Sequence, residues 1–317
     1  MANEVIKHLT KSKSVALFVH INPDWDCIGS AFALRYSLRS LGVKCDIFTQ
    51  APLNDYLGFM QSDVIPYTED ATMPDYECYC ALDVNNTDRM GDWGKFFAQK
   101  EDTVCIDHHL GGCDFAKLCF SDHKRSSTGE LIFDLLEMIS FPITKEVASY
   151  IYCAISSDTG SFQYASVNKR THEIVMALLD AGIDSAYLSS MLYERNSLKK
   201  LKLQAEAIMS INVYKNGEIA IAKITDEVMK KYNAVKADTE GLAQIPRTLD
   251  GVVLSAFLTE QPGGIVRASL RATGDFDIEP IARKFGGGGH KKAAGCTFTG
   301  VSADKAEELL VEELLKL

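Results

Sequence analysis

Carboxylate and imidazole side chains recur in this sequence directly after apolar segments. The first apolar run ends in a segment with His20, Asp24 and Asp26, the third ends at Asp83, and the fourth ends in Asp107, His108 and His109. Asp158 follows a later apolar stretch. Oxygen and imidazole ligands without thiolates are typical of sites for hard or borderline cations such as Mn²⁺ and Mg²⁺. We therefore interpret these residues as candidate ligands of divalent cations.

Each of these residues, taken alone, also has an ordinary structural explanation. An aspartate after a strand often caps a helix, and Asp26 could cap a helix that begins near Ile28. A histidine at the end of a strand is usually a hydrogen-bonded polar residue. Taken together, however, five aspartates would repel one another strongly if they met without cations. The whole set therefore favours metal binding over coincidence.

A second chemical signal lies in the glycine run 286–289, which His290 follows. Consecutive glycines can adopt positive φ and direct backbone N–H groups at an anion, although such a run is equally typical of a flexible loop. From residue 264 to 292 there are six Lys or Arg against three acids, whereas the whole chain has a net charge of −10. Arg271 is the best candidate for a bidentate phosphate contact, and strand periodicity places it on one face with Arg267 and Ser269.

The elements that must position the acidic and imidazole groups alternate along the first half of the chain. Apolar runs predict strands at 14–20, 43–49, 77–83 and 103–108, and amphipathic stretches predict helices at 28–41, 127–138, 145–156 and 171–181. Continuous apolar strands between helices are typical of a parallel sheet covered on both faces. Because ligands gather at the carboxyl ends of such strands, we expect these groups at one sheet edge.

The pattern changes after Gly182. The sequence predicts a connecting helix, then hairpins turning at Asn216-Gly217 and at 262–264, helices at 278–285 and 302–315, and a strand at 293–299. The predicted fold class is α/β, with an N-terminal parallel-sheet domain and a smaller α+β C-terminal domain. The expected boundaries are 1–185 for the catalytic domain, 186–208 for the connecting helix and 209–317 for the second domain.

Composition restricts the class of protein further. The 317 residues correspond to two domains of ordinary size, and the acidic balance argues against coating long nucleic acid by charge alone. No run of 18 apolar residues occurs, so no membrane span is expected. Residues 1–13 lack the apolar core of a signal peptide. The nine cysteines include no C-x-x-C pair, so we expect reduced thiols in a cytoplasmic protein.

Several motifs resemble those of a known family. HINPDWD, LDVNN, IDHH and SSDTGSF look like the four signature motifs of the DHH phosphoesterases, and GGGGHKKAAG (286–295) resembles the glycine-rich motif of the DHH-associated substrate-binding domain. One departure is visible in the first motif, which in the family usually reads Pro-Asp-Gly-Asp-Ala. Here Trp25 and Cys27 occupy the Gly and Ala places. The ligand types remain, so we expect the chemistry to be kept in a site with a different floor.

The resemblance implies a role for each site residue. Two divalent cations are expected, Mn²⁺ before Mg²⁺, one held by His20, Asp24 and Asp83 and the other by Asp26, Asp83, His108 and Asp158. Asp107 would orient a ligand, and His109 would face the scissile phosphate. The implied substrate-binding residues are Ser127, Arg271, Gly287, Gly288, Gly289 and His290. For Ser127, a helix cap is the alternative.

The family resemblance also implies an activity. The motifs look most similar to those of bifunctional oligoribonucleases that also act as 3′-phosphoadenosine-5′-phosphate phosphatases. We therefore expect metal-activated water to hydrolyse short RNA or DNA, dinucleotides, or 3′-phosphoadenosine-5′-phosphate. One alternative is a pApA or cyclic di-AMP phosphodiesterase. A second is an inorganic pyrophosphatase, against which the GGGGH segment argues. A third is a catalytically silent nucleotide sensor, against which the intact ligands count. No membrane partner is expected, and the protein would be a monomer or homodimer.

Overall fold

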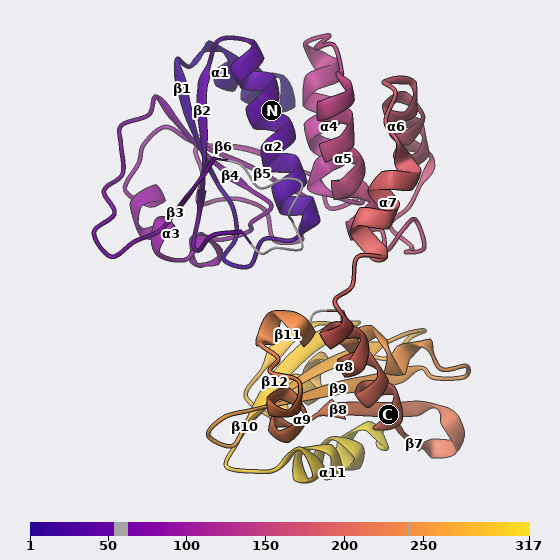
Figure 1. Ribbon diagram of the computed structural model, residues 1–317. Helices are drawn as coiled ribbons and strands as arrows, with labels where there is room; N and C mark the ends of the chain where they lie inside the picture. Colours follow the sequence, from indigo (N-terminus) through magenta and orange to yellow (C-terminus); the bar gives the residue numbers. More distant parts are fainter. Residues whose placement is uncertain (54–62, 240) are drawn as a thin grey trace. The chain divides into compact units, whose positions relative to one another are not determined.

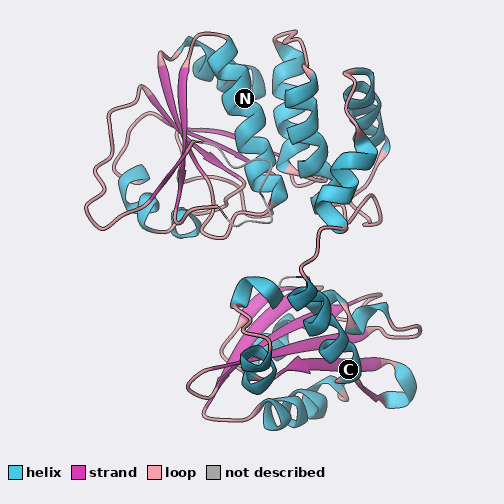
Figure 2. Cartoon of the chain, viewed as in Figure 1, coloured by secondary structure: helices cyan, strands magenta, loops and turns pink. Residues whose placement is uncertain are grey.

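The computed structural model describes residues 1–53, 63–239 and 241–317 of the chain. The chain divides into two units, Met1–Arg195 and Asn196–Leu317, each with its own sheet (Figure 1). Both units combine strands with helices (Figure 2). The predicted fold class, a parallel α/β domain followed by an α+β domain, is confirmed.

The sheet of the first unit is parallel and has the strand order β3-β2-β1-β4-β5-β6. Its strands are β1 (Ser14–Phe18), β2 (Lys44–Thr49), β3 (Val64–Pro66), β4 (Cys78–Leu82), β5 (Thr103–Asp107) and β6 (Leu118–Ser121). The four strands predicted from apolar runs are present, whereas the short edge strands β3 and β6 were missed. The chain adds strands on one side of β1 and then on the other, so β1 and β4 form the topological switch point.

Helices cover the first sheet on both faces because its strands bury alternate residues on opposite sides. Val15 and Leu17 of β1 join one apolar core, and Ala16 and Phe18 join another. The first core is covered by α1 (Ala2–Lys11), α2 (Trp25–Ser40), α4 (Thr128–Met138), α5 (Lys145–Asp158), α6 (Lys169–Asp180) and α7 (Ser185–Tyr193). The second is covered by α3 (Asp92–Phe97), whose Trp93 is buried there. Because the helices cover the two faces of the sheet, the carboxyl ends of its strands remain available for a functional site.

Helices α4 and α5 approach closely at Gly129, where a Cβ atom would lie 2.6 Å from the Cβ of Ala154. We expect Gly129→Ala to lower the free energy of unfolding by about 1–3 kcal/mol through overpacking, measured by urea denaturation. Ala154→Gly removes the obstructing methyl group at a cost of about 1 kcal/mol in helix propensity. The double variant should therefore lose less free energy of unfolding than the two single variants lose in sum. Strictly additive losses would contradict this packing account.

The second unit contains a mixed sheet with the strand order β11-β12-β10-β9-β8-β7. Its elements are β7 (Asn212–Tyr214), β8 (Ile219–Ile224), α9 (Asp226–Lys231), β9 (Leu254–Gln261), β10 (Ile265–Ala272), α10 (Glu279–Lys284), β11 (Gly288–His290), β12 (Ala293–Thr299) and α11 (Ala303–Leu314). Both predicted hairpins are present as antiparallel pairs, β7 with β8 and β9 with β10. Helices α10 and α11 contribute to the apolar core on one face of the sheet.

The connection between the units differs from the prediction of one helix over 186–208. Helix α7 ends at Tyr193, and a separate helix, α8 (Leu198–Met209), begins after a short break. Helix α7 packs against α5 in the first unit, whereas α8 packs against β8 in the second. The physical reason is that Leu203 and Ala207 of α8 are buried in the apolar core of the second unit.

The cysteines correct one further expectation. Cys113 and Cys119 form a disulfide, with Cα atoms 5.9 Å apart. The other cysteines all lie among the described residues and are buried free thiols, as predicted. The pair was missed because it follows no recognised spacing: the loop after β5 returns beside that strand to begin β6, and this return brings Cys113 to Cys119.

Within the described part of the chain, no single helix is long and apolar enough to cross a membrane, and the bent pair α6 and α7 meets the length and composition criteria only when taken together.

Candidate functional site

All six predicted metal ligands converge at the carboxyl edge of the first sheet, beside the switch point between β1 and β4. They are His20 just after β1, Asp24 and Asp26 at the start of α2, Asp83 just after β4, His108 just after β5 and Asp158 at the end of α5. All but Asp24 and Asp158 are largely withdrawn from solvent. Their convergence follows from parallel strands, which end at a common edge.

Asp83 lies at the centre of this cluster. Its Oδ2 is 3.6 Å from Nε2 of His20, and its Oδ1 is 3.7 Å from Nε2 of His108. The residue has φ +58°, a left-handed conformation that an aspartate tolerates better than most residues. Its N–H donates to the carbonyl of Ile106 on β5. The two oxygens of one buried carboxylate therefore face two different imidazoles.

The remaining predicted ligands form two groups around Asp83. In the first group, Nε2 of His20 is 3.8 Å from Oδ1 of Asp24. In the second, Nε2 of His108 is 3.6 Å from Oδ2 of Asp26 and 3.4 Å from Oδ2 of Asp158. These two groups contain the same residues as the ligand sets that the motif resemblance implied, and their binding of cations stays a prediction.

The separations within these groups are informative in themselves. Most of them exceed the length of a hydrogen bond. Ligands about 2.1 Å from one ion lie roughly 3.0–3.4 Å from each other in octahedral or tetrahedral geometry. Four of the five distances are slightly longer than this range, and the distance from His108 to Asp158 lies at its upper end. The donor set and its spacing are therefore compatible with divalent cations.

Electrostatics supports the same interpretation. Burial raises the pKa of Asp26 well above its usual value, and the charges of Asp83 and Asp158 raise it further. Burial likewise raises the pKa of Asp158 to about 6, despite the opposing effect of His108. Burial also acts to raise the pKa of Asp83, but three histidines, His20 foremost, outweigh it and lower that pKa to about 2. A cation bound among these carboxylates would relieve the repulsion that opposes the ionisation of Asp26 and Asp158.

Asp26 does not cap its own helix. The cap of α2 is Asp24, whose Oδ1 accepts a hydrogen bond from the N–H of Cys27 at 3.0 Å. Asp26 instead accepts from the N–H groups of Thr128 and Gly129 at 2.8 and 2.9 Å. The alternative explanation of Asp26 as the α2 cap is therefore wrong. Its carboxylate is held by the first turn of α4.

Asp107 orients His109. This carboxylate is completely buried, and its Oδ1 accepts a hydrogen bond from Nδ1 of His109 at 2.7 Å. Asp107 thus pairs with His109, whereas the predicted ligand His108 has its Nδ1 3.3 Å from the carbonyl oxygen of Arg125. That Asp107 orients a metal ligand stays a prediction. The bond to Asp107 raises the pKa of His109 against the effect of burial, and thereby favours a positively charged imidazole.

The segment 126–130 contains both an error of prediction and a residue that was missed. Ser127 is completely buried, and its hydroxyl accepts from the N–H of Glu130 at 3.3 Å. It therefore caps α4 and has no surface to offer a substrate. Its neighbour Thr128 was not predicted, yet its hydroxyl donates to Oδ1 of Asp83 at 2.9 Å. The SSTGE pattern signals a helix start, but it does not show what that start faces.

Cys27 occupies the place where the family motif has alanine. Its Sγ lies within 4.8 Å of ligand atoms of His20 and Asp83, and it donates weakly to the carbonyl of Leu82. Burial raises the pKa of this thiol to about 11. The neighbouring Trp25 is buried. Both departures from the motif therefore lie inside the first unit beside the acidic cluster.

In the second unit, two predicted substrate-binding residues share one row of the sheet. Arg271 on β10 and His290 on β11 both pair with Ala293 of β12. Residues directly opposite each other point to the same face, so these two side chains project together from strands that lie about 10 Å apart. The opposite face, which includes Leu270, packs in the core with α10 and α11.

The glycine run is only partly a loop. Its second half forms β11 with His290, so the expectation of a simple anion-binding loop needs correction. A Cβ on Gly287 would lie 2.0 Å from the carbonyl oxygen of Gly295, and one on Gly289 would lie 2.5 Å from the Cα of Ala294. These two glycines allow the edge strand to approach β12 closely. Anion binding by Gly287, Gly288 and Gly289 stays a prediction.

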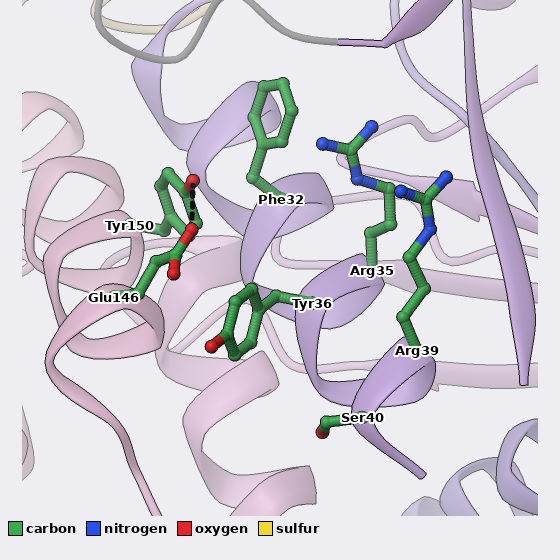
Figure 3. Close-up of a pocket in the computed structure, with 7 residues that line it drawn as sticks. All are labelled: Phe32, Arg35, Tyr36, Arg39, Ser40, Glu146 and Tyr150. Carbon is green, nitrogen blue, oxygen red and sulfur yellow. Dashed lines mark hydrogen bonds between the residues drawn. The ribbon is translucent and has the colours of Figure 1, made fainter. Parts of the chain in front are cut away.

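A separate cavity of about 430 Å³ lies along the C-terminal half of α2 (Figure 3). It is lined by Phe32, Arg35, Tyr36, Arg39 and Ser40 of α2 and by Glu146 and Tyr150 of α5. Tyr150 donates to Glu146, and the guanidinium of Arg35 lies over the ring of Phe32, 4.5 Å from its centroid (Figure 3). The acidic cluster lies at the other end of α2.

Comparison with known proteins identifies two domains in the chain. The model of the DHH family N-terminal domain matches residues 14–155, and the DHHA1 domain model matches residues 216–316. The bifunctional oligoribonuclease and PAP phosphatase NrnA of Thermus thermophilus is 26% identical over 94% of this chain and 88% of its own length. The cyclic-di-AMP phosphodiesterase GdpP of Geobacillus thermodenitrificans is 30% identical over 67% of this chain, but over only 32% of its own length.

A solved structure resembles the whole chain. It is that of an exopolyphosphatase-related protein from Bacteroides fragilis, with a TM-score of 0.89 and 29% identity. The match covers 100% of this chain and 97% of that one. The fold of both units thus recurs in a protein of similar length.

Proposed function

The chain belongs to the DHH family and carries a DHHA1 domain, and we propose on this basis that it is a phosphoesterase for short oligonucleotides, dinucleotides and 3′-phosphoadenosine-5′-phosphate. The observation that carries the proposal is the position of Asp83, whose two carboxylate oxygens face His20 and His108 separately. The near full-length similarity to NrnA proteins supports this substrate class. Hydrolysis of a phosphate ester requires an activated water and neutralised phosphate charge, and the cluster is suited to both.

In this proposal, the two ligand groups hold two divalent cations, Mn²⁺ in preference to Mg²⁺. His20, Asp24 and Asp83 would hold one, and Asp26, Asp83, His108 and Asp158 the other. Bound cations lower the pKa of a coordinated water and neutralise charge on the phosphate. The chain contributes the position of the ligands and the buried surroundings that strengthen these electrostatic effects.

His109 acts on the phosphate in this proposal. Its Nδ1 is engaged with Asp107, which leaves Nε2 as the nitrogen directed away from that carboxylate. A positively charged imidazole at this place would stabilise the charge that develops on the phosphate oxygens. Asp107 supports this role by keeping the proton on Nδ1 and fixing the orientation of the ring.

The second unit supplies phosphate recognition. Arg271 can form two parallel hydrogen bonds to a phosphate, and His290 projects from the same row of the sheet. The substrate is proposed to be short because the chain as a whole is acidic, with net charge −10, so positive charge is only local. This combination is suited to a small nucleotide.

Arg271→Ala is expected to raise KM for a dinucleotide by about 10- to 100-fold, the effect of losing charge-assisted hydrogen bonds worth about 1.5–3 kcal/mol. The free energy of unfolding should change little, because the side chain is only partly buried. Arg267→Ala is the matched control: this exposed residue lies on the same face of the same strand and should leave KM unchanged. Steady-state kinetics checks both, and an unchanged KM for Arg271→Ala would remove it from the substrate-binding residues.

A cyclic di-AMP or pApA phosphodiesterase is the second candidate. The similarity to GdpP favours it, since that match includes 67% of this chain. A silent nucleotide sensor is disfavoured because all six predicted ligands converge in one cluster.

The decisive experiment compares substrates directly. Purified protein with Mn²⁺ is incubated with dinucleotides, 3′-phosphoadenosine-5′-phosphate, pApA, cyclic di-AMP and pyrophosphate, and kcat/KM is determined for each. The proposal predicts the highest values for dinucleotides or 3′-phosphoadenosine-5′-phosphate. A clear preference for pApA, cyclic di-AMP or pyrophosphate, or binding without turnover of any of them, would overturn it.

A further inference from the structure

We propose that Thr128 is a positioning residue that fixes two of the acidic metal ligands relative to each other. Its backbone N–H donates to Oδ2 of Asp26 at 2.8 Å, and its hydroxyl donates to Oδ1 of Asp83 at 2.9 Å. The two carboxylates come from different elements, the first turn of α2 and the end of β4. One residue in the first turn of α4 therefore joins both. This inference rests on the proposed function, which makes these carboxylates metal ligands.

The hydrogen bond from the Thr128 hydroxyl to Asp83 is shielded from solvent and is unusual for a threonine at the start of a helix. Thr128 is completely buried and Asp83 is only 2% exposed, so water has little access to this bond. A threonine hydroxyl near the start of a helix usually bonds to nearby backbone, as the hydroxyl of Thr171 accepts from the N–H of Asn168 in α6. In Thr128 the hydroxyl is directed at a side chain 45 residues away in sequence.

The contact also selects one oxygen of Asp83. The hydroxyl engages Oδ1, the oxygen that faces His108, while Oδ2 faces His20. A hydrogen bond to Oδ1 restricts rotation of the carboxylate about its terminal bond. It therefore keeps each oxygen turned to its own group, which a bridging ligand requires.

The backbone contact adds a second restraint. The N–H groups of Thr128 and Gly129 both donate to Asp26, so the first turn of α4 fixes that carboxylate as well. Partners that orient ligands in this way commonly change metal affinity 10- to 100-fold when removed. Thr128→Val retains the backbone N–H and the shape of the side chain, and removes only the bond to Asp83.

The test measures Mn²⁺ binding to the full-length protein by isothermal titration calorimetry, together with kcat for a dinucleotide. We expect Thr128→Val to weaken Mn²⁺ binding by about 10- to 100-fold. Thr128→Ser keeps a hydroxyl and should bind Mn²⁺ within about threefold of the unmodified protein. Thr128→Ala, which also retains the N–H, replaces the valine variant if that variant does not fold.

Thr171→Val is the matched control. Thr171 is also completely buried in the first turn of a helix, and its hydroxyl also makes one hydrogen bond. Its loss should lower the free energy of unfolding without changing Mn²⁺ affinity. Equal Mn²⁺ affinity of Thr128→Val and Thr171→Val would overturn the role of Thr128 while leaving the proposed function intact. Absence of Mn²⁺ binding to the unmodified protein would instead overturn both.

Discussion

Replacing Asp83 with alanine is expected to reduce kcat for a dinucleotide by at least about 10³-fold in the presence of Mn²⁺. Asp83 is 2% exposed and contributes one oxygen to each ligand group, so its loss removes the only described side chain that faces both His20 and His108. We also expect the number of Mn²⁺ ions bound per chain, measured by equilibrium dialysis, to fall. Asp83→Asn should show the same loss with less effect on packing.

Asp134→Ala provides the control for removing a buried aspartate. Asp134 is also buried, but it forms ion pairs with Arg125 and Arg170 beyond the acidic cluster. Its loss should lower the free energy of unfolding and leave Mn²⁺ stoichiometry unchanged. If Asp83→Ala retained near-normal kcat and metal content, the bridging role of Asp83 would be refuted.

Removing divalent cations is expected to abolish turnover completely and to lower the thermal stability of the first unit. Without cations, the carboxylates of Asp26 and Asp158 carry raised pKa values, because desolvation and neighbouring acids oppose their ionisation. Cations that bind only the folded state stabilise it by about 2.7 kcal/mol at a concentration 100 times the Kd. Chelation should therefore lower the Tm, and added Mn²⁺ should restore both Tm and kcat.

The measurement pairs an activity assay with differential scanning fluorimetry of the chelated and the Mn²⁺-reconstituted protein. Asp83→Ala serves as the control, since its Tm should respond much less to Mn²⁺. Full turnover in excess chelator would exclude the metal mechanism proposed above.

The amino-acid sequence alone predicts the sheet edge at which the site lies. Apolar runs identify β1, β4 and β5, and their continuous character indicates parallel strands buried on both faces. Parallel strands end at a common edge, so His20, Asp83 and His108 could be placed together without knowledge of the tertiary structure. The Asn216-Gly217 turn likewise predicts the hairpin of β7 and β8.

The short edge strands could not be predicted in this way. Strand β3 has three residues and β6 four, and neither contains a fully buried residue. An edge strand needs no continuous apolar run, so periodicity carries little signal for it. The disulfide of Cys113 with Cys119 joins the loop after β5 to β6, and its spacing in the sequence matches no recognised pattern.

Hydrogen-bond partners within the site were decided by the tertiary structure alone. Sequence periodicity indicates the face or the end of an element to which a side chain belongs, but not which distant element meets it there. Asp26 was therefore compatible with capping α2, and only the docking of α4 shows that it accepts from Thr128. Ser127 and Thr128 are adjacent, similar residues, yet one caps α4 and the other contacts Asp83. Local patterns determine residue type and secondary structure, whereas contacts between residues 45 or 102 positions apart depend on how the helices pack on the sheet.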